Sequence, residues 1–257
     1  MTRRIRFFDT PVDLLTMDQT VARAEAAMSA RDTDPASPPV RHTALNVAKL
    51  IKLDKDPELA ADVRGSDIIG IDGMGIVLGL KMFGVDGAQR VPGVDLFLEL
   101  LAHCARTGRR PYILGAKQSQ LDAAIIEAKR RFPGLEFAGS RHGYFAQEDE
   151  SEIVTGIRES GADCLFVAMP TPHKERFLNR NASKLRVPFI MGVGGSVDVL
   201  AGHVSRAPEW MQQAGLEWFH RMVKEPRKMV GRYASTNSAF AMLLLKTRLS
   251  GRNPISS

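Results

Sequence analysis

The chain has 257 residues, 44% hydrophobic and 25% charged, so it can bury a sizeable core as one large domain or as one domain with an appendage. This composition excludes a chain that is disordered as a whole. The net charge of +6 is confined to one end, because the segment from His203 to Arg252 holds nine Lys and Arg against three Glu. A localised basic segment favours an anionic partner there.

The sequence shows neither the pattern of a signal peptide nor that of a membrane-spanning segment. The N-terminus is basic but lacks the apolar stretch of a signal peptide, and no apolar run approaches the roughly 18 residues of a membrane span. Cys104 and Cys164 lie in apolar stretches without a CxxC spacing, which is typical of core residues in a reducing compartment. We therefore expect a cytoplasmic protein.

The expected elements begin with a helix from about Pro11 to Ala30, followed by a proline-rich segment at residues 31–39 that predicts a flexible loop. Beyond it, short β-prone runs alternate with helical patterns such as Gln118–Phe132. The expected strands are Val40–Leu45, Ile68–Ile71, Pro111–Leu114, Leu135–Ala138, Leu165–Ala168 and Phe189–Val193. This alternation predicts an α/β fold, a Rossmann-like, mostly parallel sheet covered by helices. We expect that domain to span residues 1–202 and a basic, amphipathic, helical appendage to span residues 203–257.

Several expected strands end in small or polar residues that open a helix, and such loops form the ligand crevice of open parallel sheets. Asp72 follows Ile68–Ile71 and is flanked by Gly73 and Gly75, which let a ligand approach the backbone. A carboxylate there is placed to act as a base. An Asp before a helical pattern is equally common as a helix N-cap, so the local sequence leaves both roles open.

A second glycine turn, Gly194–Gly195, precedes Asp198, whose carboxylate can hold ribose or sugar hydroxyls while backbone N–H groups meet phosphate. Tight packing is the alternative. The turn lacks the third glycine or alanine of a dinucleotide fingerprint, and the sequence contains no P-loop.

Two Asp-x-Asp pairs, Asp32-Thr-Asp34 and Asp54-Lys-Asp56, have the spacing that binds a divalent ion in many sugar transferases. One lies in the proline-rich segment and the other on a charged helical stretch, so we interpret both as solvated surface. The histidines show no ligand spacing, although His142 and His173 lie in expected loops. We predict no metal and no cofactor.

Nine short segments follow one another along the chain: Thr43-Ala-Leu-Asn46, Asp72-Gly-Met-Gly75, Arg90-Val-Pro-Gly-Val-Asp95, Tyr112-Ile-Leu-Gly115, Gly143-Tyr-Phe145, Gly192-Val-Gly-Gly-Ser-Val-Asp198, Arg206-Ala-Pro-Glu-Trp-Met211, Gly215-Leu-Glu-Trp218 and Glu225-Pro-Arg227. In this order they resemble the WecG/TagA/CpsF family of bacterial glycosyltransferases over most of the chain. The clear departure is Pro170-Thr-Pro-His-Lys-Glu175, where the family usually reads Gly-Ser-Pro-Lys-Gln-Glu. Lys174 thus replaces a ligand-contacting amide and His173 replaces a lysine, and these changes bear on the identity of the donor more than on the reaction class.

The resemblance implies an inverting transfer in which Asp72 takes the proton from the acceptor hydroxyl. It implies a UDP-linked sugar of the N-acetylmannosamine type, or a related hexose, as donor, and a sugar on a polyprenyl diphosphate as acceptor, in cell-surface polysaccharide synthesis. The residues expected to bind substrate are Thr43, Asn46, Gly73, Gly75, Arg90, Asp95, Gly115, Lys174, Glu175, Gly194, Gly195, Asp198, Arg206 and Arg227. Of these, Arg90, Lys174, Arg206 and Arg227 are the candidate cations for the leaving diphosphate.

The basic C-terminal segment also contains Trp210, Trp218 and the apolar run Ala239–Leu245, a combination that suits an anionic membrane surface. We expect peripheral association with the inner face of the plasma membrane, with an ordinary packed helical appendage as the alternative. Two other functions remain open: a nucleic-acid binder, for which no motif is present, and an NAD-type oxidoreductase, whose fingerprint is incomplete. We expect no nucleic-acid partner and allow for a homo-oligomer.

Overall fold

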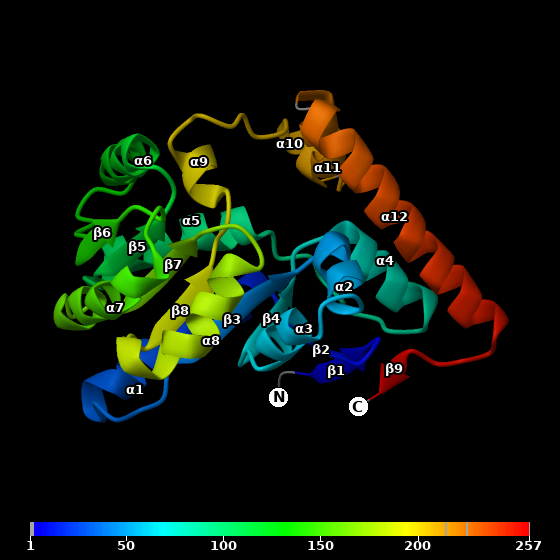
Figure 1. Ribbon diagram of the computed structural model, residues 1–257, viewed down its shortest axis with the longest axis horizontal. Helices are drawn as coiled ribbons and strands as arrows, with labels where there is room; N and C mark the ends of the chain where they lie inside the picture. The colour runs from blue at the N-terminus through cyan, green and yellow to red at the C-terminus, as the bar shows by residue number, and fades with distance from the viewer. Residues whose placement is uncertain (1–2, 214, 225, 257) are drawn as a thin grey trace.

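The computed structural model describes residues 3–213, 215–224 and 226–256, and the side chains of all of these except 213, 221, 227–230, 232 and 233. Its central sheet has six strands (Figure 1). Their order is β4 (Ile68–Ile71), β3 (Val40–Leu45), β8 (Phe189–Gly192), β7 (Cys164–Ala168), β5 (Pro111–Gly115) and β6 (Gly139–Arg141). All neighbouring strands are parallel, which confirms the Rossmann-like α/β fold.

Helices cover both faces of this sheet. They are α1 (Met17–Thr33), α2 (Val47–Leu53), α3 (Pro57–Arg64), α4 (Met74–Met82), α5 (Gly93–Thr107), α6 (Gln118–Arg131), α7 (Glu150–Glu159), α8 (His173–Leu185) and α9 (Ser196–Leu200), with a 3-10 turn η1 (Gln147–Asp149). Successive strand residues point to opposite faces: Phe166 and Met191 pack with α1, α5 and α6, whereas Leu165 and Ile190 pack with α7 and α8. The strands are apolar throughout because both faces are buried.

At β3 the connections of two neighbouring strands diverge at the carboxyl edge of the sheet. The chain leaves β3 for α2, whose Leu50 packs on one face, and leaves the neighbouring β8 for α9, whose Val197 packs on the other. Loops that diverge from adjacent strands leave an opening outside the strand ends, where ligands bind in such folds.

Three sequence-based expectations were wrong in their boundaries. Residues Thr10–Asp13 form strand β2, paired with β1 (Arg4–Phe7), so the first helix starts only at Met17, after a capping box between Thr16 and Gln19. That helix continues to Thr33, so the first three residues of the expected loop at 31–39 are helical.

The third error concerns the strand expected at Leu135–Ala138. Leu135 is instead buried in a turn after α6, and the strand β6 begins at Gly139. A Cβ on Gly139 would lie 2.6 Å from the ring of Tyr112, so only glycine fits at this point of the pairing with β5.

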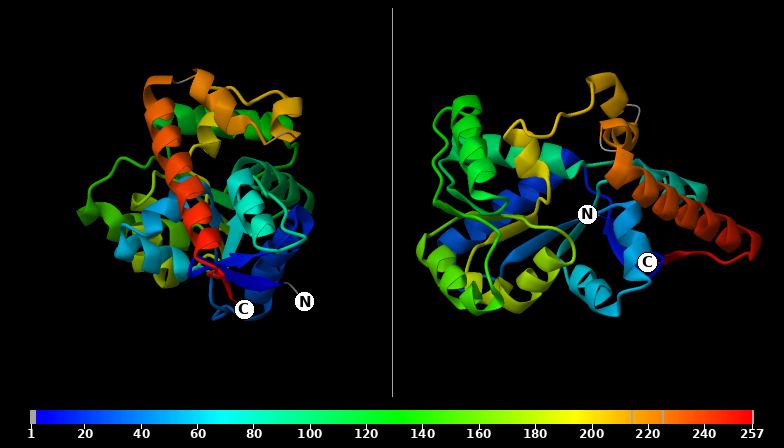
Figure 2. Two further views of the ribbon diagram at one scale, coloured as in Figure 1. Left: turned by 90° about the vertical axis from the view of Figure 1, so that its right-hand side faces the viewer. Right: turned by 45° about the horizontal axis from the view of Figure 1, so that its top comes forward.

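The C-terminal segment forms α10 (Glu209–Gln213), α11 (Glu217–Lys224) and α12 (Pro226–Leu249), and then β9 (Ile255–Ser256), which pairs with β1 (Figure 2). Helix α12 lies along α2 and α4, and its Phe240 and Leu244 are buried in the same core as Phe7. Contact is close because a Cβ on Gly79 of α4 would meet the Phe240 ring at 3.0 Å. The expected appendage therefore packs on the sheet domain, and the boundary at residue 202 stays a prediction.

Candidate active site

Asp72 directly follows β4 at the carboxyl edge, and its side chain is half-buried. One carboxylate oxygen accepts the backbone N–H of Gly93, the first residue of α5, at 2.8 Å. The other accepts from the side-chain amide of Asn46 at 3.3 Å. Helix α4 is not capped by Asp72, because its N-cap is Gly73 and has no side-chain cap bond. Two positioned donors hold the carboxylate at the carboxyl edge and leave lone pairs free for a substrate proton.

Asn46 connects this carboxylate to the next loop. Its side-chain oxygen accepts from the backbone N–H of Lys49 at 3.0 Å and so caps α2, while its amide donates to Asp72. The pairing of β3 with β4 brings the two loops together, because the backbone N–H of Asp72 donates to the carbonyl of Leu45 at 2.9 Å. The structure therefore places two of the expected site residues, Asn46 and Asp72, in direct contact through the side-chain amide of Asn46.

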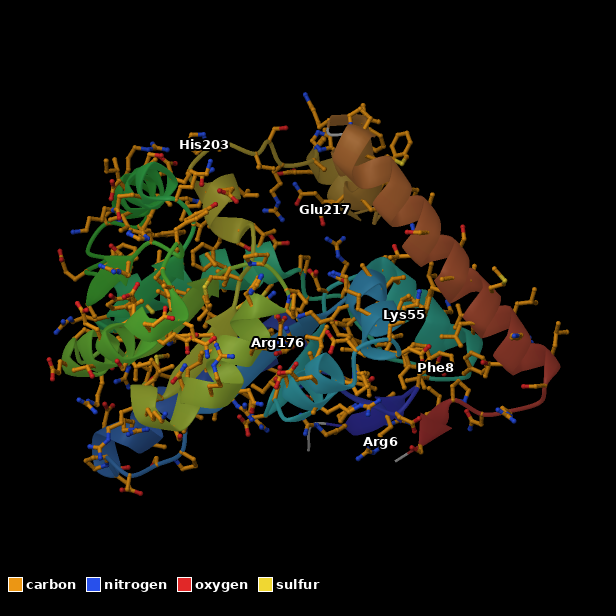
Figure 3. The ribbon with its side chains drawn as sticks, viewed as in Figure 1. Arg6, Phe8, Lys55, Arg176, His203 and Glu217 are labelled. Carbon is orange, nitrogen blue, oxygen red and sulfur yellow. The ribbon has the colours of Figure 1, made fainter. Side chains whose placement is uncertain are left out.

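Arg90 ties the C-terminal segment to the Asp72 loop. Its Nε donates to the backbone carbonyl of Asp72 at 3.0 Å and its Nη1 to the carbonyl of Gln212 at 3.1 Å, and its Nη2 pairs with Glu217. Glu217 lies at the end of α11 nearest the sheet domain (Figure 3). The C-terminal segment is thus linked through Arg90 to the backbone of Asp72.

Arg206 makes a second link in the same place. It pairs with Asp95 in the first turn of α5, and its Nε lies 3.8 Å from a carboxylate oxygen of Glu217. Gly215, with φ of +72°, passes over Met74, where a Cβ would lie 3.0 Å from the Met74 side chain. These ion pairs hold Arg90 and Arg206 in the join between tail and sheet domain.

A buried group of charges lies near Asn46, at the starts of α2 and α8, the helices that follow β3 and β7. The Nζ atoms of Lys49 and Lys174 each lie 3.0 Å from the same oxygen of Glu175. The hydroxyl of Thr171 accepts a hydrogen bond from Lys174 at 2.6 Å and donates one to Glu175 at 3.0 Å. The stem of Lys174 covers Gly192 at the end of β8, where a Cβ would lie 3.0 Å away. We call Lys49, Lys174, Glu175 and Thr171 the lysine cluster.

The glycine turn after β8 also opens on the carboxyl edge. Gly194 has φ of +53°, in the left-handed region that favours glycine, and Gly195 is the N-cap of α9. Burial raises the pKa of the Asp198 carboxyl in this helix, against the effect of His203 and Lys117. Gly115, with φ of +133°, leaves no room for a side chain because a Cβ would lie 2.3 Å from the carbonyl oxygen of Ala168.

The comparison of the sequence with known proteins assigns the chain to a family. The family model described as the glycosyl transferase WecG/TagA/CpsF family matches residues 5–254. The chain belongs to this family of glycosyltransferases. It is also 33% identical over 174 residues, which is 68% of this chain and 67% of the other, to the N-acetylglucosaminyldiphosphoundecaprenol N-acetyl-beta-D-mannosaminyltransferase of Bacillus spizizenii. The resemblance inferred from the motifs is confirmed, and the protein is a transferase of cell-surface polysaccharide synthesis.

Some expected site residues of the glycosyltransferase lie elsewhere. Thr43 is buried, and its hydroxyl bonds to Ser66, at the opposite end of β4 from Asp72. Gly75 faces Val47, where a Cβ would lie 2.5 Å from a methyl carbon, so it serves the packing of α4 on α2. The side chain of Arg227 lies outside the described residues.

Sequence reasoning missed two residues of the site, Lys49 and Glu217. Each occupies a charged, helical stretch that reads as ordinary surface, and only its partner far along the chain reveals its position. A lysine in the first turn of a helix is one available signal, because the helix N-terminus disfavours a cation there unless a carboxylate is near.

One aspartate of each Asp-x-Asp pair forms an ion pair with an arginine of the glycosyltransferase. Asp32 pairs with Arg109, and Asp56 caps α3 and pairs with Arg176. Among the described residues, no group of three or more His, Cys, Asp or Glu is placed to hold a metal ion. None of the helices in the described ranges is long and apolar enough to cross a membrane.

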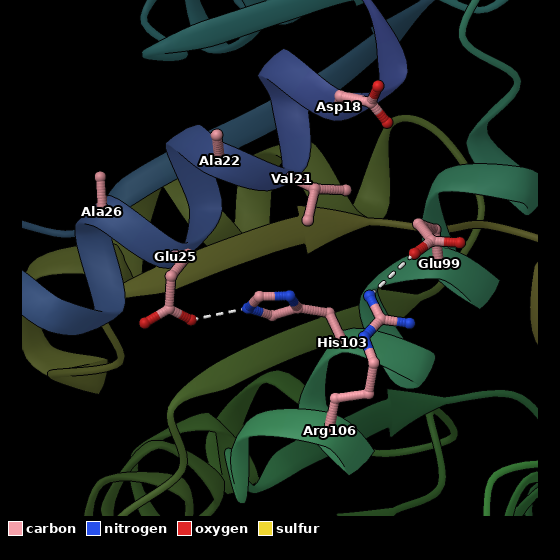
Figure 4. Close-up of a pocket in the computed structure, with 8 residues that line it drawn as sticks. All are labelled: Asp18, Val21, Ala22, Glu25, Ala26, Glu99, His103 and Arg106. Atoms are coloured by element: carbon pink, nitrogen blue, oxygen red, sulfur yellow. Dashed lines mark hydrogen bonds and ion pairs between the residues drawn. The ribbon is translucent and has the colours of Figure 1, made fainter.

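A groove of about 540 Å³ lies between α1 and α5, away from Asp72 (Figure 4). Its charged side chains pair with one another: His103 with Glu25 at 2.7 Å, and Arg106 with Glu99 at 3.0 Å. None of the expected site residues lines it. The chemistry of the glycosyltransferase is therefore sought at the carboxyl edge and not in this groove.

Proposed function

We propose that this glycosyltransferase moves an N-acetylmannosamine-type or related hexose from a UDP-sugar to a sugar carried on a polyprenyl diphosphate. The acceptor class is supported by the Bacillus spizizenii relative, whose name specifies a diphosphoundecaprenol-linked N-acetylglucosamine. The observation that carries the proposal is the Asp72 carboxylate, held by Gly93 and Asn46 at the carboxyl edge of the sheet.

In the proposed reaction the acceptor oxygen attacks the anomeric carbon of the donor while Asp72 accepts the hydroxyl proton. The bond from that carbon to the diphosphate breaks, UDP leaves with the electron pair, and the anomeric configuration inverts. A placed general base contributes typically about 10²–10⁴ in rate. The substrate-binding roles of Asn46, Gly73, Gly194, Gly195 and Asp198 follow from their positions on this edge.

The same enzyme would meet its lipid-linked acceptor at a membrane surface, on the cytoplasmic face. Along α12, Met242, Leu245 and Leu249 point to solvent at spacings of three and four residues, opposite the buried Phe240. Leu78 and Met82 of α4 are also exposed, and Arg248 donates to the carbonyl of Met82 at 3.1 Å, so the two helices lie next to each other here. We call Leu78, Met82, Met242, Leu245 and Leu249 the apolar surface.

Lysines and arginines accompany the apolar surface. Lys81, Lys246 and Arg248 are exposed on the same two helices, and α12 contains no acidic residue. Cations beside apolar side chains favour an anionic headgroup layer, at about 1 kcal/mol for each cation near the surface. This combination supports peripheral membrane association through α4 and α12.

Leu245→Glu is expected to weaken binding to vesicles containing an anionic phospholipid by roughly 10-fold or more, since a carboxylate replaces an exposed apolar group that would enter the membrane surface and is repelled by the headgroup charge. Sedimentation with vesicles measures this. The matched control is Ile126→Glu, the same kind of change at an exposed position on α6, and it should bind as the wild type. Equal vesicle binding by both variants would remove the apolar surface from the proposal.

The donor and acceptor classes are tested by a panel of UDP-sugars offered with a polyprenyl-diphosphate-linked sugar, scored by release of UDP. We expect release with one hexosamine-type donor, and only when the acceptor is present. A panel in which no UDP-sugar is consumed, while another nucleotide sugar is, would contradict the proposed donor.

A further inference from the structure

Two of the four cations expected to meet the leaving diphosphate, Arg90 and Arg206, are occupied in a different task. Arg90 and Arg206 pair with Glu217 and Asp95 and join the tail to the sheet domain. A diphosphate that gains negative charge in the transition state still requires positive groups placed beforehand. Among the described residues, the buried cations at the carboxyl edge are Lys49 and Lys174 of the lysine cluster.

Within the part of the chain that the structure describes, the lysine cluster has one positive charge more than its paired carboxylate neutralises. Two ammonium groups, on Lys49 and Lys174, share one carboxylate, and these three side chains are at most a tenth exposed. A buried charge without a counter-ion is costly, and removal from water makes its attraction for an anion stronger. The cluster is therefore short of one negative charge.

The position of the lysine cluster suits the leaving group of the proposed reaction. Lys49 is bonded through its backbone to Asn46, which in turn donates to Asp72, and Lys174 lies over the end of β8. The cluster lies on the α2 and α8 side of the sheet, whereas the Asp72 carboxylate bonds both to α5 on the other side and to Asn46 at the start of α2. In an inverting displacement the base and the leaving group stand on opposite sides of the anomeric carbon. Here the end of β3 lies between Asp72, at the end of β4, and Gly192, at the end of β8, which Lys174 covers.

We propose that Lys49 and Lys174, held by Glu175 and Thr171, bind the diphosphate of the nucleotide donor and stabilise it as it leaves. This inference rests on the proposed UDP-sugar donor. It also gives a physical meaning to Lys174 in place of the family's usual amide: the amide offers a dipole, whereas the ammonium offers a full charge. Glu175 acts as a positioning residue that keeps two like charges within reach of one ligand.

The protonation of Lys174 supports this role. Burial and the neighbouring Lys49 lower the pKa of Lys174 to about 8, while both lysines hold the pKa of Glu175 at about 2 against the effect of its burial. Lys52 of α2 acts in the same direction as Lys49. Lys174 is mostly charged at pH 7 and loses its proton as the pH rises through about 8, so diphosphate affinity should fall as the pH is raised above 7.

The test compares the affinities of UDP and UMP, measured by calorimetry at pH 7, for the wild type and for Lys49→Met and Lys174→Gln. Only the diphosphate reaches the cluster, so we expect both variants to lose roughly 10-fold or more in UDP affinity and to keep their UMP affinity within about 2-fold. Lys52→Met, on the exposed side of the same helix, is the matched control and should retain the preference for UDP.

Each other outcome has a distinct meaning. If the wild type prefers UDP to UMP and both variants keep that preference, the lysine cluster is only a tie between α2 and α8 and the inference is overturned. If the wild type binds neither nucleotide, the proposed donor class fails first. If a variant does not fold, Lys174→Arg decides: it should keep UDP binding and abolish the loss of affinity above pH 7, and an unchanged pH profile would contradict the role of Lys174.

Discussion

Replacing Asp72 with asparagine is expected to lower kcat by about 10²–10⁴-fold, the range that a placed general base contributes. The amide has the shape of the carboxylate and can still accept the N–H of Gly93, but it cannot take a proton from the acceptor. Its NH₂ group would face the amide of Asn46, whose own oxygen is used to cap α2, so a stability cost of about 1 kcal/mol is expected. Steady-state UDP release and urea unfolding measure the two effects separately.

The control for Asp72→Asn is Asp86→Asn, which removes the same charge from an exposed loop after α4. It should leave kcat within about 2-fold of the wild type. Near-native turnover in Asp72→Asn, with the control equally active, would show that the carboxylate only holds the start of α5. That structural role is the one alternative that the geometry leaves for Asp72.

Phe240→Ala is expected to lower the free energy of unfolding by about 3–5 kcal/mol, the usual cost of removing a buried aromatic ring. Phe240 is 6% exposed, and its ring meets that of Phe7 edge-on at 6.4 Å between centroids. It also packs on Gly79, so its removal leaves a cavity between α12, α4 and the N-terminal strands. The midpoint and slope of urea unfolding provide the measurement.

Met242→Ala is the matched control for Phe240→Ala, because it lies two residues further along the same helix and is 63% exposed. It should change stability by less than about 0.5 kcal/mol. A small loss in Phe240→Ala, or a separate unfolding transition for the C-terminal segment, would mean that the tail folds as an independent appendage. The expected result has a practical consequence: deleting the residues after 202 removes part of the core, so point substitutions are the sounder test of tail function.

The sheet was predictable because its elements are local. The runs Ile68–Ile71 and Leu165–Ala168 are short, apolar and rich in β-branched or aromatic residues, and helical patterns separate them. The predicted strands agree with the structure within one residue except for Leu135–Ala138. There the pattern failed because a buried apolar residue in a turn looks like one in a strand, and the pairing depends on a glycine opposite Tyr112.

The N-terminal strands illustrate a pairing that no local pattern reveals. Residues Thr10–Asp13 belong to a sheet whose third strand, β9, comes from the other end of the chain. Sequence reasoning assigned them to a helix because the helical pattern that follows begins so soon after them. They form a strand because β1 pairs with β2 on one side and with β9, from the other end of the chain, on the other side.

By itself, the sequence determined the family, the parallel sheet and the place of Asp72 at a strand end, because each depends on neighbouring residues or on an ordered set of motifs. Only the tertiary structure decided which charges meet. Arg90 and Glu217 are 127 positions apart, and Lys49 and Glu175 come from different halves of the chain. Nothing in a local pattern distinguishes a lysine on the surface from one buried beside a distant carboxylate, because the difference lies in the partner that the fold supplies.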